Sequence, residues 1–277
     1  MRKELGGPSS FAGSRPRGRP RVIARAARER MEDHWVQADR YNRRARVTGV
    51  ERLTTTGTVR LTLEVADDRP FHHLPGNFVG IECWAADLGW RRSPYCIVSP
   101  PSDDGRFQLL VRVVPDGPVA SYLGSLEVGD IVTFRGPTGR TMIPRWRDRD
   151  LVLVGTGVGI GPLVALARYL LPQPGFDHEI ELFWGLRQEE DLCLLDELED
   201  LATEFPNFTY RITLTQPPAA WTGLRGRVTQ SMPTLLHQIA DKRFILCGNA
   251  AMMEELRAAL SDVGVNGDLI YDEPYFN

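Results

Sequence analysis

The stretch Leu151-Val152-Leu153-Val154-Gly155-Thr156-Gly157-Val158-Gly159-Ile160-Gly161-Pro162 decides the fold of this chain. Its four leading apolar residues predict a fully buried strand. Pro162 falls in the first turn of an expected helix, where a missing N–H costs nothing. Backbone N–H groups at such a helix start bind anions such as a pyrophosphate. An ordinary tight turn is the alternative, but four glycines in seven residues favour a bound ligand.

Buried strands alternate with helices from this stretch to the C-terminus. Such alternation predicts βαβ units and a parallel sheet. The further strands are expected at residues 179–185, 208–215, 243–249 and 267–273. The helices are expected at Pro162–Leu171, Glu189–Glu204, Thr229–Ile239 and Ala250–Leu260.

The preceding residues, from about 46 to 143, follow a different pattern. In residues 58–65 apolar and polar side chains alternate, which predicts a half-buried strand. Similar segments lie at 77–84, 107–114 and 130–136, with a short helix expected at Pro118–Gly124. Strands at this spacing predict a small antiparallel barrel. The expected domains are therefore a β-barrel at 46–145 and a parallel α/β domain at 149–277, after a basic extension at 1–45.

The glycine-rich stretch differs from the common dinucleotide fingerprint. The pattern G-x-G-x-x-G fails because Ile160 occupies the third glycine position. The second strand ends in Trp184-Gly185-Leu186-Arg187, without the acidic residue that would hold a ribose hydroxyl. An arginine there suits a phosphate better than a ribose.

From about residue 46 to 277 the chain resembles the ferredoxin–NADP(+) reductase family, in which a flavin-binding barrel precedes a nucleotide-binding α/β domain. Five segments carry the resemblance, in the family's order. In the barrel, His73–Val79 resembles PGQFV, Arg92–Ser99 resembles R-x-Y-S-x-x-S, and Gly117–Leu123 resembles the family's glycine-led helix start. In the α/β domain, Gly155–Pro162 resembles GTGxGIxP and Phe244–Met252 resembles CGNPxM. The end of the chain, Tyr271–Asn277, resembles the family's terminal E-x-Y-W.

The resemblance implies that the barrel binds FAD. Tyr95 would stack on the flavin ring and Arg92 would pair with the pyrophosphate. The other implied flavin-binding residues are Cys96, Ile97, Val98, Ser99, Val119, Ala120, Ser121 and Phe276. Two departures stand out: Ser93 occupies the family's arginine position, and Cys96 replaces a serine or threonine that hydrogen-bonds the flavin. A bulge at Pro94 could bring Arg92 back.

The resemblance also implies a nicotinamide site. Cys247, Glu273, Tyr275 and Cys96 would lie near the reacting atoms. The implied nucleotide-binding residues are Gly155, Thr156, Gly157, Gly159, Pro162, Arg187, Thr215, Gln216, Arg227, Cys247, Gly248 and Asn249. The structural alternatives are a buried cysteine at 247, a docked terminal strand, and solvated surface arginines.

The choice between NADPH and NADH depends on a few residues. NADP-specific members carry Ser-Arg where this chain has Thr215-Gln216, which removes one guanidinium. Arg187 and Arg227 match other basic positions and could compensate, with Arg225 as an extra candidate. NADPH is therefore expected over NADH.

The expected function is electron transfer between NADP(H) and a one-electron carrier, ferredoxin or flavodoxin, by hydride transfer to flavin N5. The sequence lacks the cysteine spacing of a built-in iron–sulfur module, so the acceptor should be a separate chain. Two alternatives stay open: an NADH-dependent reductase component of an oxygenase, and a flavin-binding electron-transfer subunit or sensor without turnover. The five histidines show no metal-ligand spacing, and no metal is expected.

Composition limits where the chain works. Its 277 residues are 42% hydrophobic and 25% charged, and no apolar run reaches bilayer length, so no membrane span is expected. Four scattered cysteines fit a reducing compartment, which indicates the cytoplasm. Residues 1–46 carry a net charge of +8 and the remainder −11. The basic extension is interpreted as a solvated tail or an upstream start with Met31 as the true beginning; a nucleic-acid or membrane-surface arm and a transit peptide are the alternatives, and a nucleic-acid partner is not expected.

Overall fold

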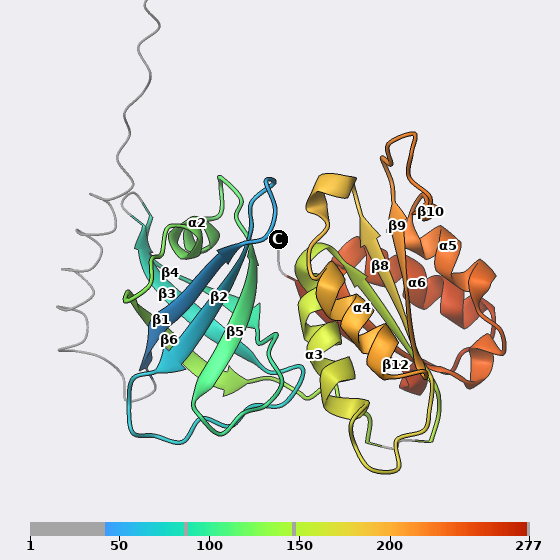
Figure 1. Cartoon of the computed structure of the whole chain (residues 1–277), viewed down its shortest axis with the longest axis horizontal. Coiled ribbons are helices and arrows are strands. Elements are labelled where there is room, and N and C mark those ends of the chain that lie inside the picture. The colour runs from blue at the N-terminus through green and yellow to red at the C-terminus, as the bar shows by residue number, and fades with distance from the viewer. Residues whose placement is uncertain (1–41, 86–87, 146–147, 276–277) are drawn as a thin grey trace, which may run out of the picture.

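The computed structural model describes residues 42–85, 88–145 and 148–275. Two six-stranded sheets form two domains that lie side by side, the first with blue-to-green colours and the second with yellow-to-red colours (Figure 1). This arrangement confirms the expected fold class, an antiparallel barrel followed by a parallel α/β domain. The helix expected around residues 24–41, and nearly all of the basic extension, lie outside the described residues.

The first sheet is antiparallel, with strand order β4-β3-β6-β1-β2-β5. An isolated bridge between Ile97 and Leu109 connects the end of β4 to β5, and the Val98 N–H donates to the Gln108 carbonyl beside it. The two edge strands therefore meet at one end, which closes the sheet there. The strands are β1 (Arg43–Arg52), β2 (Thr58–Val65), β3 (Phe78–Ala85), β4 (Gly89–Cys96), β5 (Arg106–Arg112) and β6 (Ile131–Thr138).

The interior of the barrel follows from the alternation in its strands. Along β2, Val59, Leu61 and Leu63 are buried with the rings of Phe107 and Phe134. Helix α2 (Pro118–Gly124), which has the expected bounds, buries Val119, Ala120 and Leu123 in the same core. The helix thus packs on the barrel beside β3 and β4.

Strand β1 was not among the expected strands, because it begins with two arginines. Arg43 is nevertheless buried: its guanidinium donates to both carboxylate oxygens of Asp67 and to the carbonyls of Arg69 and Pro70. Burial alone would raise the pKa of Asp67, but the hydrogen bonds from Arg43 and Arg69 outweigh it and hold that pKa well below its usual range. A buried, fully paired arginine can thus start a strand that hydropathy alone does not reveal.

The second sheet is parallel, with strand order β10-β9-β8-β7-β11-β12. Helices α3 and α4 pack on one face and α5 and α6 on the other, in two separate apolar clusters (Figure 1). The strands are β7 (Leu151–Thr156), β8 (Ile180–Leu186), β9 (Phe208–Leu214), β10 (Leu224–Arg225), β11 (Arg243–Asn249) and β12 (Ile270–Tyr275). The helices are α3 (Ile160–Leu170), α4 (Leu195–Glu204), α5 (Val228–Leu235) and α6 (Ala250–Asp262).

Two expected helices are shorter in the structure. The prediction of one helix over Glu189–Glu204 was wrong: a single 3-10 turn, Glu189–Asp191, is followed by Leu194 in a left-handed conformation (φ 56°) before α4 begins. Tertiary contacts explain the break, because Asp191 accepts hydrogen bonds from Arg112 and Thr56 of the barrel. The expected helix at Thr229–Ile239 ends at Leu235.

The strand order reverses between β7 and β11. From β7 the chain moves outward through β8, β9 and β10, and it then returns to place β11 and β12 on the other side. The loops after β7 and β11 therefore diverge to opposite faces of the sheet. In open α/β sheets ligands bind in the crevice at such a switch point.

Side chains of both domains hold them together. Arg60 of β2 pairs with Glu197 of α4, which also lies 3.4 Å from Arg168 of α3. Leu110 of β5 belongs to the buried cluster under α3. These contacts fix the barrel against helices α3 and α4.

Candidate functional site

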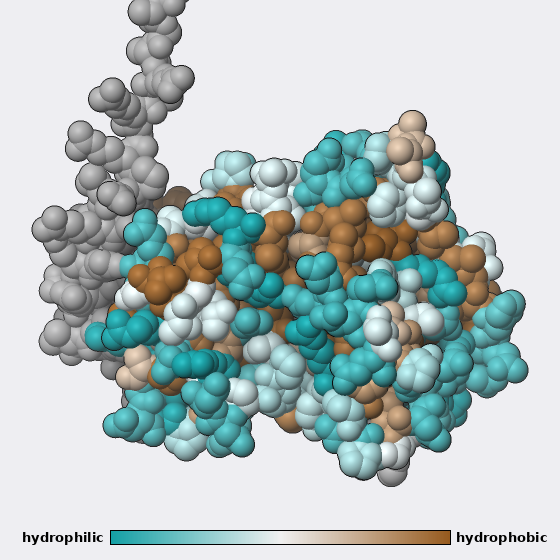
Figure 2. All heavy atoms as spheres, in the orientation of Figure 1, coloured by the Kyte–Doolittle hydropathy of each residue, from teal (hydrophilic) through white to brown (hydrophobic). Residues whose placement is uncertain are grey.

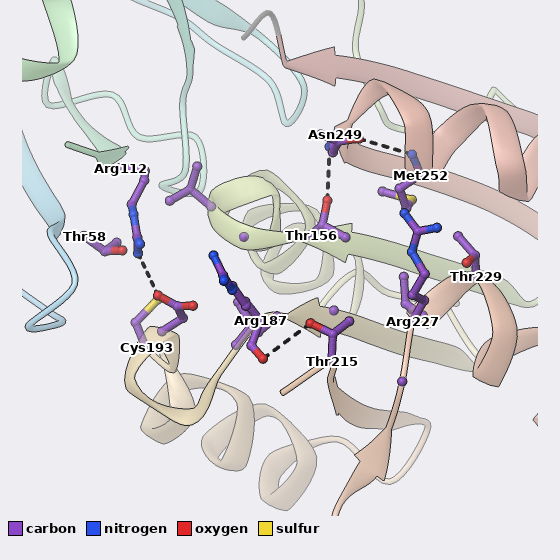
Figure 3. A pocket seen from close by; sticks show the side chains of 17 residues that line it. Thr58, Arg112, Thr156, Arg187, Cys193, Thr215, Arg227, Thr229, Asn249 and Met252 are labelled. Carbon is purple, nitrogen blue, oxygen red and sulfur yellow. Dashed lines mark hydrogen bonds and ion pairs between the residues drawn. The ribbon is translucent and has the colours of Figure 1, made fainter. Parts of the chain in front are cut away.

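A cavity of about 740 Å³ lies at the switch point of the parallel sheet, and we call it the switch-point cavity. Figure 3 shows it bounded by barrel residues on one side and by loops of the α/β domain on the other. Figure 2 shows hydrophobic side chains in the hollow between the domains, with hydrophilic ones around them. Six of the expected nucleotide-binding residues line the cavity: Thr156, Gly157, Arg187, Thr215, Arg227 and Asn249.

The two diverging loops are tied to each other at the floor of this cavity. The Thr156 hydroxyl accepts a hydrogen bond of 3.1 Å from the Asn249 N–H (Figure 3). The Asn249 side chain caps α6 by accepting from the N–H groups of Ala251 and Met252. Gly157 has a φ of 54°, a conformation that favours glycine. The backbone between β7 and α3 thus has one defined shape.

Packing explains most of the remaining glycines of the stretch. A Cβ on Gly159 would lie 2.3 Å from the Cys247 carbonyl oxygen, and a Cβ on Gly161 would lie 2.5 Å from Val98 of the barrel. Gly155 is buried in β7 and Pro162 is buried in α3, so both shape the loop from below without lining the cavity. The glycines therefore allow close contact between backbones and between domains.

Basic side chains stand at the outer rim of the switch-point cavity. Arg187 donates from Nε to the Gln216 side chain at 3.1 Å, and Arg227 pairs with Glu255 at 2.9 Å. Arg225 instead donates to three carbonyls of the loop at 218–221. Arg187 and Arg227 can therefore meet a phosphate, whereas Arg225 stabilises its own loop.

The barrel supplies the opposite wall, which the sequence did not indicate. Arg112 of β5 donates to Asp191 at 2.9 Å and to Thr56 at 2.8 Å. Cys193 lies nearby, and burial raises the pKa of its thiol to about 12, so this thiol is no nucleophile. Arg112 and Asp191 are far apart in sequence, and only long-range folding brings them to one cavity.

A second cavity, of about 570 Å³, lies along β4 and we call it the β4 cavity. Its walls are the residues of β4 from Arg92 to Cys96, the start of α2, and Glu273 of β12. Tyr95 is partly buried there, and this burial raises the pKa of its hydroxyl. The cavity therefore offers an aromatic ring, a thiol and a guanidinium within one recess.

The register of β4 decides which of its side chains face one another. The pairing with β3 is continuous, with Glu82 opposite Arg92, Gly80 opposite Pro94 and Val79 opposite Tyr95. The suggestion that Pro94 bulges the strand was therefore wrong. Because side chains alternate, Arg92 lies on the face opposite to Tyr95, and Ser93 lies on the face of Tyr95.

Arg92 lines the β4 cavity although it lies on the face of β4 opposite to Tyr95. Its guanidinium lies 3.6 Å from Glu82, a carboxylate that it shares with Arg135 at 3.0 Å. One negative charge thus serves two arginines. Arg92 also lines a third cavity of about 630 Å³, with Arg43, Arg69 and Arg135.

The start of α2 contributes less than the sequence suggested. Val119 and Ala120 line the β4 cavity. Ser121, however, donates its N–H to the Gly117 carbonyl at 2.8 Å and its hydroxyl to the Val114 carbonyl at 3.1 Å. The expectation that the Ser121 N–H serves a ligand was wrong, because the helix already uses it.

Three residues after Tyr95 have structural contacts. Ile97 is buried in the barrel core, Val98 packs against Gly161 of α3, and the Ser99 hydroxyl accepts from the Gln108 N–H. None of them lines the β4 cavity. Ile97 and Ser99 thus stabilise the barrel, and Val98 packs the barrel against the α/β domain.

The C-terminal strand brings the last expected residues to the two cavities. Glu273 lines the β4 cavity and pairs in register with Cys247. Cys247 is fully buried and Gly248 is pressed against Thr156, so Asn249 is the residue of β11 that lines the switch-point cavity. The backbone of Tyr275 pairs with Asn249, and Phe276 lies outside the described residues.

The two cavities adjoin. Arg112 and Val158 line both of them, so a ligand that extends from one cavity reaches the other. The sequence contained Val158 within the glycine-rich stretch, but nothing marked it as the point of contact. The aromatic ring of Tyr95, the guanidinium of Arg92 and the apolar wall fit a flat ring carrying phosphates.

Known domains match both halves of the chain. Residues 46–143 match the oxidoreductase FAD-binding domain, and residues 153–258 match the oxidoreductase NAD-binding domain. The chain belongs to the ferredoxin–NADP(+) reductase family. Its cofactors are accordingly FAD and a pyridine nucleotide, and it is an oxidoreductase of this family.

Individual relatives support this membership. The chain is 28% identical over 78% of its length to a ferredoxin–NAD(P)(+) reductase component of naphthalene dioxygenase/salicylate hydroxylase systems from Ralstonia, covering 64% of that protein. It is 29% identical over 83% of its length to a toluate dioxygenase electron transfer component from Pseudomonas putida, covering 67% of it. The chain thus spans about two thirds of these relatives.

Solved structures show the same fold. An Amycolatopsis cytochrome P450 reductase superposes with a TM-score of 0.74 at 27% identity, covering 84% of this chain and 69% of that one. A ferredoxin NADP+ reductase from Neisseria gonorrhoeae with bound FAD and NADP has a TM-score of 0.70 at 21% identity, covering 86% and 100%.

The described residues hold neither a candidate membrane helix nor a candidate metal cluster. Among the helices at residues 42–85, 88–145 and 148–275, none has the length and apolar character that crossing a membrane requires. Within the same ranges, no three histidine, cysteine or acidic side chains are grouped as metal ligands.

Proposed function

We propose that this member of the family transfers electrons from NADPH through FAD to a separate one-electron carrier, a ferredoxin or a flavodoxin. The observation that carries the proposal is the contact between the two cavities at Arg112 and Val158. A nicotinamide held at the switch point can reach a flavin ring held on Tyr95. FAD, when bound, takes two electrons from a nicotinamide and releases them one at a time.

On the flavin side, the residues of the β4 cavity would bind and orient the cofactor. Tyr95 supplies a partly buried aromatic ring. Arg92 supplies a guanidinium, of which Glu82 neutralises only a part because it also serves Arg135. Cys96, 8% exposed, would place a weak donor beside the ring. The resemblance implies that Tyr275 and Phe276 cover the ring; Phe276 and the side chain of Tyr275 lie outside what the structure describes.

On the nucleotide side, Thr156, Gly157 and Asn249 would hold the pyrophosphate end of the coenzyme. Arg187 would meet the 2′-phosphate, since its one side-chain partner among the described residues is the neutral Gln216. Thr215 and Arg227 complete this rim. Cys247 would act near the nicotinamide only through its backbone, because its side chain is buried.

A second candidate function is an NADH-dependent reductase component of an oxygenase. Two observations favour it: the Ralstonia and Pseudomonas relatives are components of oxygenase systems by name. In addition, Glu255 neutralises Arg227 and Gln216 stands in the place of a family arginine, which lowers the positive charge offered to a 2′-phosphate. A flavin-binding subunit without turnover is the outcome expected if the displaced Arg92 fails to orient FAD.

Stopped-flow reduction of the bound flavin by NADPH and by NADH tests these functions. Faster reduction by NADPH at equal concentration supports the main proposal, and faster reduction by NADH supports the oxygenase component. A protein that binds FAD but is reduced by neither supports the subunit. Reduced ferredoxin or flavodoxin formed in a coupled assay then identifies the class of acceptor.

The proposed division of the chain is an FAD-binding domain at 46–145 and a nucleotide-binding domain at 149–277, and the proposed compartment is the cytoplasm. The contribution of the basic extension is testable by truncation. A truncation should stop at residue 41, because Asn42 donates to Glu82 and Arg43 is buried against Asp67. Retention of FAD and of reduction rate would show that the extension has no part in the chemistry.

A further inference from the structure

The C-terminal strand carries a pair of polar side chains whose arrangement the proposed function does not yet use. In β12, Tyr271 and Glu273 are two residues apart and so lie on one face of the strand. The Tyr271 hydroxyl donates to the Glu273 carboxylate at 3.0 Å, which is closer than its other acceptor, the Arg140 carbonyl at 3.5 Å. Asp272 lies on the opposite face, where it pairs with Arg257 of α6.

The ring of Tyr271 is held by groups from both domains. The Arg140 guanidinium, from the segment that follows β6, lies 5.4 Å from the ring centroid. The ring also packs on the apolar cluster beneath α3. An aromatic ring fixed on both sides holds its hydroxyl in one place, which in turn restricts the carboxylate bonded to it.

Glu273 is the acidic residue of β12 that lines the β4 cavity. Tyr95 and Cys96 line the same cavity. The charged and titratable groups that act on it are Tyr271, Arg140 and Asp272. Burial raises the pKa of Glu273, while the hydrogen bond from Tyr271 and the charge of Arg140 oppose that rise.

We propose that Tyr271 is a positioning residue that keeps the Glu273 carboxylate ionised at the β4 cavity and thereby sets the lower pH limit of flavin reduction. The inference rests on the proposed function. A nicotinamide that gives up a hydride, one proton with two electrons, becomes a cation. An ionised carboxylate beside it stabilises that cation, and a protonated one does not.

The chain contains a matched pair elsewhere. Tyr210 of β9 donates to Glu199 of α4 at 2.9 Å, in the same chemistry and at nearly the same distance. Neither residue lines the switch-point cavity or the β4 cavity. Tyr210→Phe is therefore the control for Tyr271→Phe, since each substitution removes one hydroxyl and keeps its ring.

The experiment measures the rate of flavin reduction in stopped flow between pH 5 and 9 for the FAD-loaded protein. Loss of a hydrogen bond to an ionised carboxylate raises the pKa of that carboxyl group, so Tyr271→Phe should move the acidic midpoint up by about one pH unit. Tyr210→Phe should leave it in place. Glu273→Gln should remove the midpoint, and adding Tyr271→Phe to Glu273→Gln should change nothing further.

A pH titration of the visible spectrum of bound FAD provides a second reading that needs no turnover. A spectral midpoint that shifts to higher pH in Tyr271→Phe supports the role of the hydrogen bond between Tyr271 and Glu273. If that shift is seen but neither nicotinamide coenzyme reduces the flavin, the proposed function fails and this inference stands. The inference is overturned if Tyr271→Phe leaves the acidic midpoint unchanged, or if Glu273→Gln leaves the pH profile of flavin reduction unchanged. Thermal unfolding of each variant checks that the fold is retained.

Discussion

The switch-point cavity and the β4 cavity adjoin, but they are built in different ways. The first is lined mainly by loops at the carboxyl ends of strands in the parallel sheet, whose positions follow from topology, and the barrel closes it on one side with Thr58 and Arg112. The second is lined by side chains along the edge of one strand, by a helix start and by a strand of the other domain. A shift of one residue is absorbed by a loop, whereas in a strand it moves a side chain to the opposite face.

The largest expected effect tests the backbone character of the switch-point cavity. Gly159→Ala places a Cβ 2.3 Å from the Cys247 carbonyl oxygen and 2.8 Å from its carbon. Backbone atoms cannot rotate away, so the α/β domain should lose about 3 kcal/mol or more of unfolding free energy. Urea unfolding followed by tryptophan fluorescence measures the loss.

Gly157→Ala is the matched control for this substitution. A Cβ added at Gly157 would meet no atom within 4 Å, so the cost is that of the left-handed backbone alone, about 1 kcal/mol. Equal losses for the two variants would show that close packing at Gly159 does not define the loop.

The next effect concerns the basic rim of the same cavity. Arg187→Gln should lower the selectivity for NADPH over NADH by about tenfold, as expected for loss of one charged hydrogen bond. Arg227→Gln should lower it less, because Glu255 already neutralises that arginine. Steady-state kcat/KM ratios for the two coenzymes measure both variants.

Glu255→Gln sharpens this test, since it removes the competing carboxylate and should raise the NADPH preference. A selectivity that does not respond to Arg187→Gln but falls with Arg227→Gln would assign the 2′-phosphate to the other arginine.

A smaller effect is expected on the flavin side. Ser93→Arg places a guanidinium on the face of Tyr95, two residues before that ring, whereas the arginine that β4 already carries on this face, Arg91, lies four residues before it. It should tighten FAD binding about fivefold, because an exposed charged bond contributes about 1 kcal/mol. Calorimetric titration of the FAD-free protein measures the change.

Arg92→Gln serves as the comparison for this variant. A large loss of FAD affinity with Arg92→Gln and no gain with Ser93→Arg would show that Arg92 reaches the pyrophosphate around the strand edge. The length of the Arg92 side chain, and not the register of β4, would then decide which guanidinium serves the β4 cavity.

The sequence predicted the parts of the fold that depend on local pattern. Helix α2 has the expected bounds, and the strands predicted from 151 onward lie within one or two residues of their predicted positions, apart from the start of the last one. The two-residue strand β10 was not predicted. The pattern failed where tertiary contacts decide. Asp191 bonds to the barrel and interrupts the expected helix, and buried Arg43 starts a strand that its polarity conceals.

The same division holds for the site. Thr156, Gly157 and Asn249 were predictable because they lie at the carboxyl ends of β7 and β11, in segments that resemble the family's motifs. Arg112 was not, since only the docking of the two domains brings it to the cavity. The face of Arg92 depends on the pairing of β4 with β3, which no local pattern specifies.

Pro94 has a consequence for how the chain meets other molecules. Strand β4 stands at the edge of its sheet, and an edge strand can pair with the edge of another molecule. A proline has no N–H to donate, and such residues are found at edges where a ladder must stop. The residue that interrupts the family motif therefore also leaves position 94 without a donor for pairing with a strand of a second molecule.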